Sequence, residues 1–366
     1  MRVGGMRADP SVAGGGGLDR KPTPLADEDR FAGCLIGQCL GDALGFIVEG
    51  RPPRTCRAYV DTVLKGGRAH EGRRGPFAFG QYSDDSQLAR EMMQSYTARG
   101  GFDAADYAAR IAAIFAEERI VGRGLATEQA ARRLAAGVPW REAGTPPPSA
   151  GNGSAMRAGP VGLMFFDDAA ALIDAARDQG RITHADLRCS AGAVAIAGAV
   201  ALAMEEGPLD PARFLGQLAE WAGSVEDSVG RSLVDLAGWV RLPPDEAVTV
   251  IAGAGLAPDF RDAWEGISPF VVGSVLWSLY AFVRHPEDYW EAVCTAIAVG
   301  GDVDTTAAMT GAIAGARNGL GAVPGDLAAR LNDRGTWGED ELAALAGEVW
   351  RLKTAAAAQE RSLPSC

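Results

Sequence analysis

Glycine recurs every four residues near the start of the chain, at Gly33, Gly37, Gly41 and Gly45. Residues four apart lie on the same face of an α-helix, so a helix here would present one smooth face without side chains. A glycine inside a helix costs about 1 kcal/mol relative to alanine. The stripe therefore predicts that another helix, or a ligand, packs directly against the backbone of this segment.

Two other segments are similarly rich in small residues. Residues 307–320 read AAMTGAIAGARNGL, and residues 190–204 form a run of mostly small apolar side chains. The second run is too short to span a bilayer and predicts a buried core helix.

The chain as a whole predicts an all-α fold. Period-two runs of β-branched and aromatic residues, which are typical of strands, are nearly absent. The sequence shows no repeat period, which argues against a solenoid. A first helix begins at residues 27–29, and residues 51–81 are expected to form an irregular loop. Further helices are predicted over residues 84–97, 103–118, 128–136, 169–177, 190–204, 211–222, 227–242, 245–252, 268–283 and 339–358.

The predicted domain organisation is simple. Residues 1–26 form a Gly/Pro-rich leader that is expected to be disordered, and residues 359–366 a frayed polar tail. A single all-α domain is expected over residues 27–358, with short loops and no linker.

Residues 300–306 (GGDVDTT) supply two carboxylates and two hydroxyls immediately before the small-residue run. Asp and Thr at the start of a helix can cap its free N–H groups and suit the positive end of its dipole. For this segment alone, helix capping is favoured over a metal site.

Residues 82–87 (YSDDSQ) repeat this composition at a second predicted helix start. Four carboxylates and several hydroxyls suit Mg²⁺ or Mn²⁺, which prefer oxygen ligands. The adjacent acids Asp84 and Asp85 would point in different directions and suit two ions better than one. The metal interpretation requires that the two clusters meet in space.

The charge balance excludes some partners. The net charge is −12 and the pI is near 4.9, which argues against non-specific nucleic-acid binding and against a polybasic membrane anchor. An anionic substrate would therefore need metal ions or helix N-termini at its site.

Cysteine and histidine do not form a recognisable metal motif. None of the six cysteines lies in a Cys-x-x-Cys pair, which favours reduced thiols over disulfides or zinc, and the three histidines are widely spread. Oxygen ligands must therefore carry any metal chemistry. Residues 1–21 lack an apolar signal-peptide core, and we expect a soluble, cytoplasmic protein that is a monomer.

Three features have two interpretations each. Residues 151–157 (GNGSAMR) could cradle an oxyanion with backbone N–H groups or form an ordinary turn. Glu49 could be a solvated loop residue, or a general base or metal-adjacent carboxylate. A lone histidine such as His184 is more often structural than a ligand.

Six motifs, in this order, resemble the ADP-ribosylglycohydrolase family. They are GCLIGQCLGDALGFIVE, YSDDSQLA, VGRG, GNGSAMRAGPVG, TH before a small-residue helix, and GGDVDTTAAMTGAIAGA, and the resemblance covers about residues 31–352. It implies a compact single-domain bundle of α-helices with the active site in a cleft between helices.

The resemblance also implies roles for individual residues. Catalytic roles fall on Glu49, Asp85 and Asp304. A dinuclear Mg²⁺ or Mn²⁺ site is matched by Ser83, Asp84, Asp85, Asp302, Asp304 and Thr305. The ADP-ribose site is matched by Gly122, Gly124, Ser149, Gly151, Asn152, Gly153, Met156 and His184.

The implied activity is metal-dependent hydrolysis of the ribosyl C1 bond between ADP-ribose and a modified acceptor, foremost an arginine or serine side chain of a protein. The expected partner is an ADP-ribosylated protein or other acceptor, and ADP-ribose is the product. The alternatives are an inactive ADP-ribose-binding or structural relative, and a dinuclear-metal hydrolase of another nucleotide of this kind.

Departures from the family pattern are small. Ser83 and Ser86 stand where threonine is common, Val303 separates the paired acids, and Ala150 replaces a tyrosine of some relatives. None of these changes removes a metal ligand, which argues against the inactive alternative.

Overall fold

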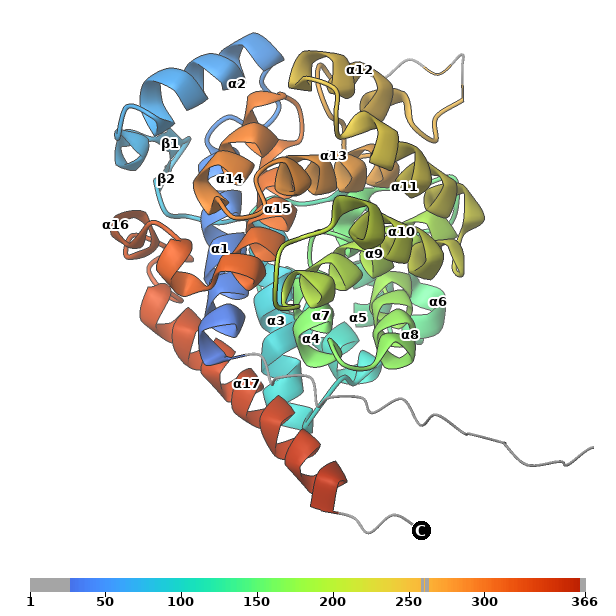
Figure 1. Cartoon of the computed structure of the whole chain (residues 1–366). Coiled ribbons are helices and arrows are strands. Elements are labelled where there is room, and N and C mark those ends of the chain that lie inside the picture. The colour runs from blue at the N-terminus through green and yellow to red at the C-terminus, as the bar shows by residue number, and fades with distance from the viewer. Residues whose placement is uncertain (1–26, 258–259, 261–262, 363–366) are drawn as a thin grey trace, which may run out of the picture.

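The glycine face of α1 (Glu28–Phe46) packs against α15 (Val303–Asn318) at backbone distance in the computed structural model of the chain. A Cβ atom on any of the four glycines would lie 2.2–2.6 Å from a carbonyl oxygen of α15. On the other side of the contact, a Cβ atom on Gly311 or Gly315 of α15 would lie similarly close to a carbonyl oxygen of α1. The predicted close helix contact is thus confirmed, and both helices lie in the centre of the molecule (Figure 1).

The structure describes residues 27–257, 260 and 263–362, with backbone alone for residues 357–362. The predicted leader, residues 1–26, lies outside the described residues, as do residues 363–366 of the predicted tail. The last helix continues to Ser362, whereas the sequence predicted its end at residue 358.

The fold is all-α, as predicted. α9 (Leu187–Ala203) and α13 (Val271–Arg284) are buried along nearly their whole length and pack with α15 in the core. The other α-helices surround this centre (Figure 1): α2 (Pro53–Tyr59), α3 (Asp84–Arg99), α4 (Ala104–Ala116), α5 (Leu125–Ala135), α6 (Trp140–Ala143), α7 (Gly159–Met164), α8 (Ala169–Arg181), α10 (Pro211–Gly223), α11 (Asp227–Trp239), α12 (Pro244–Gly253), α14 (Tyr289–Ala298), α16 (Gly325–Ala328) and α17 (Glu339–Ser362).

Several of the outer helices begin at an aspartate. The carboxylates of Asp103, Asp168, Asp210 and Asp288 accept hydrogen bonds from backbone N–H groups of the first turns of α4, α8, α10 and α14. These bonds satisfy donors that have no partner within the helix, which fixes where each helix starts.

The prediction of an irregular loop over residues 51–81 was wrong. This segment contains α2, a π-helical turn (Val60–Leu64), a 3₁₀ turn (Ala69–Glu71) and a short antiparallel hairpin of β1 (Arg73–Arg74) and β2 (Phe77–Ala78). Cys56, Tyr59 and Leu64 are buried on one side of it, and the Tyr59 hydroxyl donates to the Leu44 carbonyl at 3.2 Å. The Arg, Gly and Pro content of the segment concealed this apolar face.

Other helix boundaries differ from the predicted ones by a few residues. α5 begins at Leu125 rather than at residue 128, and α13 at Val271 rather than at residue 268. Before α13 the chain is extended, because Phe270 pairs with Gly151 in an isolated β-bridge. Two further 3₁₀ turns, Asn152–Ser154 and Leu320–Ala322, complete the elements.

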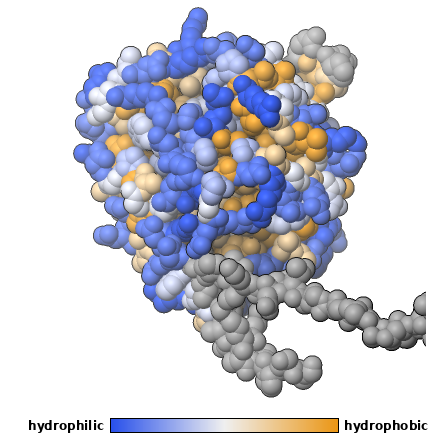
Figure 2. All heavy atoms as spheres, viewed as in Figure 1, coloured by the Kyte–Doolittle hydropathy of each residue, from blue (hydrophilic) through white to orange (hydrophobic). Residues whose placement is uncertain are grey.

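The face drawn in Figure 2 is mostly hydrophilic, with hydrophobic residues gathered mainly in the right half of the view. Within the described part of the chain, no helix has both the length and the apolar character that crossing a membrane requires.

We predict that Gly41→Ala destabilises the fold by about 2 kcal/mol or more, because its Cβ would lie 2.2 Å from the Ala307 carbonyl oxygen. The urea midpoint measures this effect. Gly216→Ala in α10 is the matched control, since its Cβ would meet nothing within 4 Å and it should gain about 0.5–1 kcal/mol from helix propensity. Equal midpoints for the two variants would contradict the backbone-contact interpretation.

Candidate active site

α1 holds the first acidic cluster through a buried carboxylate, Asp42. Its oxygens accept hydrogen bonds from Ser83 N at 2.9 and 3.0 Å, from Ser86 N at 3.1 Å and from Ser86 Oγ at 2.7 Å. Asp42 thus caps the N-terminus of α3 from a different helix. The sequence analysis missed this residue, although an acid inside the glycine stripe was a usable signal.

The second cluster lies at the same end of the contact between α1 and α15 as Asp42. A Cβ atom on Gly45 would come within 2.5 Å of the Asp304 Cα atom, so the first turn of α15 touches the last turn of α1. Glu49 follows shortly after α1. Carboxylate oxygens of Glu49, Asp302 and Asp304 all lie within 4.8 Å of one another.

The two clusters meet in one cavity of about 370 Å³. Of the residues that the sequence singled out, it is lined by Glu49, Asp84, Asp85, Gly122, Gly124, Ser149, Gly151, Asn152, Gly153, Met156, His184, Asp302, Asp304 and Thr305. Ser83 is not among the lining residues, but it contacts one of them, because its hydroxyl donates to Asp85 Oδ2 at 2.8 Å.

Hydrogen bonds fix the orientation of Asp302. It accepts from Asn152 Nδ2 at 2.5 Å and from Thr305 Oγ1 at 3.3 Å. The Asn152 backbone N–H donates to the Pro269 carbonyl at 2.9 Å. Asn152 therefore donates hydrogen bonds to groups of the protein through both its side-chain amide and its backbone N–H, and has no free N–H group for a ligand anion.

Burial raises the pKa of the site carboxyls. The pKa of Asp85 rises to about 6 through burial. That of Asp302 rises to about 7 through burial and the nearby Asp85 charge. The pKa values of Asp84 and Asp304 lie well above the ordinary range, through burial and then through neighbouring carboxylates. Buried acids this close together either keep their protons or are neutralised by a bound cation.

The residues fit a hard metal ion. Glu49, Asp302 and Asp304 offer converging carboxylate oxygens, and Asp85 Oδ1 is buried without a hydrogen-bond partner among the described residues. Oxygen donors of this kind match Mg²⁺ or Mn²⁺ rather than softer metals. The acidic cluster could therefore hold a metal ion.

Glu49 also has a cationic neighbour. Arg74 of β1 lies 2.5 Å from Glu49 Oε2 and donates to the Phe46 carbonyl at 2.7 Å. Its guanidinium carbon lies 4.6 Å from the centre of the Phe46 ring. Through Arg74, the hairpin contacts both Glu49 and the end of α1. The sequence analysis did not predict this contact, because it expected residues 51–81 to form an irregular loop.

Two glycines allow close approaches in the cavity wall. Gly122 has a φ of +73°, and a Cβ there would lie 2.8 Å from Asp84 Oδ1. A Cβ on Gly153 would lie 2.8 Å from the His184 ring. Only glycine fits either position without displacing a site residue.

His184 is held as a neutral imidazole. Burial and the charge of Arg157 lower its pKa to about 3. Arg157 Nη2 donates to Thr183 Oγ1 at 2.8 Å, and Thr183 Oγ1 lies 2.8 Å from His184 Nδ1. The Thr183 hydroxyl, which accepts from Arg157, can donate its proton to Nδ1, an arrangement in which the ring proton is on Nε2.

Other lining residues were missed by the sequence analysis. Arg123 is the one arginine or lysine among the described residues that line the cavity, and Trp264 lines it too. Arg123 stood inside the quoted VGRG motif, whereas no pattern distinguished Trp264 from a core aromatic residue.

A family model described as ADP-ribosylglycohydrolase matches residues 23–359. The chain belongs to the ADP-ribosylglycohydrolase family. ADP-ribosylhydrolase ARH3 from Gallus gallus is 29% identical over 347 residues, which cover 87% of this chain and 92% of that protein. The Homo sapiens ARH3 is 30% identical over 81% of this chain and 87% of that protein.

Two further similarities fit this assignment. ADP-ribosylarginine hydrolase Tri1 from Pseudomonas putida (strain GB-1) is 27% identical over 82% of this chain and 74% of that protein. A solved ADP-ribosylglycohydrolase-related protein complex superimposes with a TM-score of 0.66 at 28% identity, covering 89% of this chain and 98% of the matched one. As a member of this family, the chain is an ADP-ribosyl hydrolase, which acts on a glycosidic bond of ADP-ribose.

The raised pKa of Asp302 predicts a pH dependence of stability for the metal-free ADP-ribosylglycohydrolase. Between about pH 4 and pH 7 the folded chain keeps a proton on Asp302 that the unfolded chain has lost, so this group destabilises the fold increasingly as pH rises. Asp302→Asn removes the titration. The stability of the variant relative to wild type should therefore increase from about pH 5 to pH 8.

Urea midpoints in chelator at both pH values measure this difference. The comparison with wild type cancels the contribution of groups that do not interact with Asp302, such as His184. The substitution also lowers the pKa of Asp304, which the Asp302 charge raises, and this changes the difference in the same direction. A difference that stays constant with pH would contradict the raised pKa of Asp302.

Proposed function

We propose that the chain is a metal-dependent hydrolase that cleaves the ribosyl C1 bond between ADP-ribose and an acceptor side chain of a protein. One observation carries the proposal: carboxylates from two distant segments converge with Glu49 in a single cavity. Membership of the ADP-ribosylglycohydrolase family gives this cavity its substrate class.

The cavity suits an anionic nucleotide despite the acidic cluster. Its volume of about 370 Å³ lies within the usual range for small-molecule sites. Arg123 faces the diphosphate in this proposal, and the glycine turn at Gly122–Gly124 lets the chain approach it closely. The neutral His184, through Nε2–H, donates to an oxygen of the bound nucleotide.

Cleavage at C1 of the ribose builds positive charge on the sugar ring in an oxocarbenium-like transition state. Carboxylates that surround the ring stabilise this charge more than they stabilise the neutral substrate. In this proposal Glu49 accepts the proton of the attacking water, and Arg74, which contacts Glu49 Oε2, orients its carboxylate. The departing acceptor atom must gain a proton as the bond breaks.

The proposed metal content is two divalent cations, Mg²⁺ or Mn²⁺. Ser83, Asp84, Asp85, Asp302, Asp304 and Thr305 would hold them. Bound there, the ions would supply charge neutralisation, orientation of the ribose hydroxyls and a more acidic water.

The proposed acceptor is an arginine or serine side chain. The name of the Pseudomonas relative, ADP-ribosylarginine hydrolase, supports arginine as one candidate. The hairpin of β1 and β2 lies next to the site, because Arg74 contacts Glu49, and in this proposal it contributes to acceptor binding.

We predict release of ADP-ribose from at least one peptide carrying ADP-ribosylated arginine or serine, when Mg²⁺ or Mn²⁺ is present and not when chelator is added. Chromatography of the released nucleotide measures this directly. Tight calorimetric binding of ADP-ribose with no release from either peptide would contradict hydrolysis of these linkages. It would favour the binding-only alternative.

Asp304→Ala should lower the turnover number by roughly a hundredfold or more, since it removes a group that acts on the transition state. Initial rates with saturating metal measure the effect. Asp326→Ala is the control, because that aspartate is exposed in α16, outside the cavity. Near-normal turnover of Asp304→Ala would contradict the metal assignment.

A further inference from the structure

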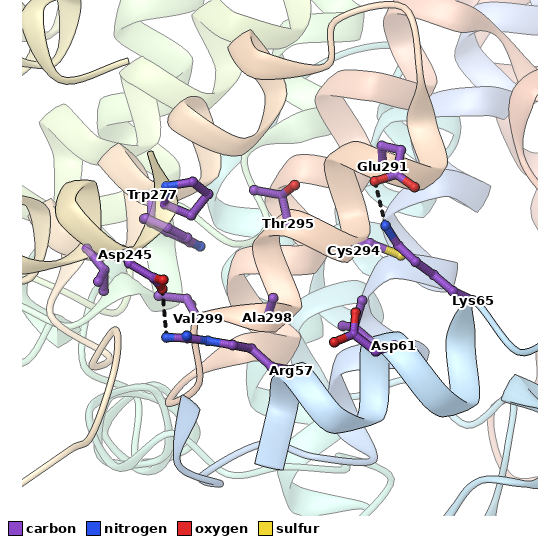
Figure 3. Close-up of a pocket in the computed structure, with 13 residues that line it drawn as sticks. Arg57, Asp61, Lys65, Asp245, Trp277, Glu291, Cys294, Thr295, Ala298 and Val299 are labelled. Carbon is purple, nitrogen blue, oxygen red and sulfur yellow. Dashed lines mark hydrogen bonds and ion pairs between the residues drawn. The ribbon is translucent and has the colours of Figure 1, made fainter. Parts of the chain in front are cut away.

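A second cleft, of about 290 Å³, lies between α2 with its π-helical turn on one side and α12, α13 and α14 on the other (Figure 3). Its apolar lining includes Val60, Val248, Trp277, Ala298 and Val299. It shares no lining residue with the active-site cavity. Its volume is at the lower end of the range for small-molecule sites.

Two ion pairs bridge this cleft. Arg57 Nη2 lies 2.9 Å from Asp245 Oδ1, and Lys65 Nζ lies 2.8 Å from Glu291 Oε2. Figure 3 shows both pairs joining residues of the α2 segment to the opposite wall. The two basic groups of the cleft are therefore already neutralised by carboxylates.

Asp61 lies between these two basic residues on the same segment. The spacing of Arg57, Asp61 and Lys65 is four and four, which in a regular helix would favour local ion pairs with Asp61. Both basic side chains instead reach across the cleft. Within the described residues, Asp61 has no ion pair, and two cations against three carboxylates leave the cleft with one net negative charge.

The backbone at Asp61 is also irregular. Val60 and Asp61 begin the π-helical turn, closed by a hydrogen bond from Lys65 N to the Val60 carbonyl at 2.9 Å. Such turns are rare and frequently occur at functional sites. Here the turn departs from the regular helix at the residue whose carboxylate lacks a partner.

We propose that this cleft is a second ligand site, which binds a small organic cation with an apolar or aromatic body. The ammonium or guanidinium group of the ligand pairs with Asp61. Its body lies on the apolar lining next to Trp277 and Val299. An anion of the same shape is disfavoured, because the cations of the cleft are engaged and the remaining charge is negative.

Calorimetry with 2-phenylethylamine tests this proposal, using full-length protein saturated with ADP-ribose so that the active site is filled. The matched probes are 3-phenylpropionate and 2-phenylethanol, which keep the ring and replace the ammonium by an anion or a neutral hydroxyl. We expect the amine to bind about tenfold more tightly than either, the effect of one charge-assisted contact.

Two variants locate the binding. Asp61→Asn should weaken the amine about tenfold and leave the neutral alcohol unchanged. Thr295→Trp places a large side chain in the cleft and should abolish binding of both. ADP-ribose affinity should stay unchanged in both variants, which separates this outcome from a failure of the proposed hydrolase function.

Three results would overturn the proposal. They are no detectable binding of the amine by wild type, equal affinity for the amine and the carboxylate, and unchanged amine affinity in Asp61→Asn. Since Asp61 is exposed and lies outside the core, that variant tests the proposal even if Thr295→Trp does not fold.

Discussion

Direct contact between the backbones of α1 and α15 is the constraint on which the rest of this structure depends. Four glycines on one helix and two on the other bring carbonyl groups to distances at which no Cβ atom fits. One end of this contact places Glu49 beside Asp302 and Asp304, and Asp42 on the same α1 holds the start of α3. A single rigid contact therefore sets the spacing of carboxylates that are far apart in the sequence.

The electrostatics follow from this geometry. Carboxylates forced together inside the protein have raised pKa values, so the folded chain without a cation is under electrostatic strain near neutral pH. A divalent cation bound there would relieve much of that unfavourable free energy, and would couple metal binding to stability and to pH. The neutral His184 and the cationic Arg123 complete a cavity in which the nucleotide and the metal ions would share the charge balance.

The sequence predicted most of what depends on local pattern. The glycine stripe predicted a close helix contact, and the acidic motifs at the starts of α3 and α15 predicted the carboxylates that line the cavity. The glycine, serine, asparagine and histidine residues of the cavity wall were predicted through the family resemblance. Features that depend on tertiary partners were not predicted. Because residues 51–81 are rich in polar residues, the sequence did not predict α2. It also did not indicate that Asp42 would accept hydrogen bonds from Ser83 and Ser86, or that the Asn152 amide would donate to Asp302. Each of these needed the position of a distant segment.

The most direct test of whether this helix contact sets the carboxylate spacing is to measure Mn²⁺ affinity by calorimetry. The proteins compared are metal-free wild type, Gly45→Ala and Gly33→Ala, and circular dichroism checks that each variant keeps its helix content. Both substitutions place a Cβ within 2.6 Å of the partner helix or of the residues just after it, but only Gly45 touches Asp304. If the helix contact sets the carboxylate spacing, Gly45→Ala should lose Mn²⁺ affinity about tenfold or more, and Gly33→Ala much less. Unchanged affinity in a folded Gly45→Ala protein would contradict this account.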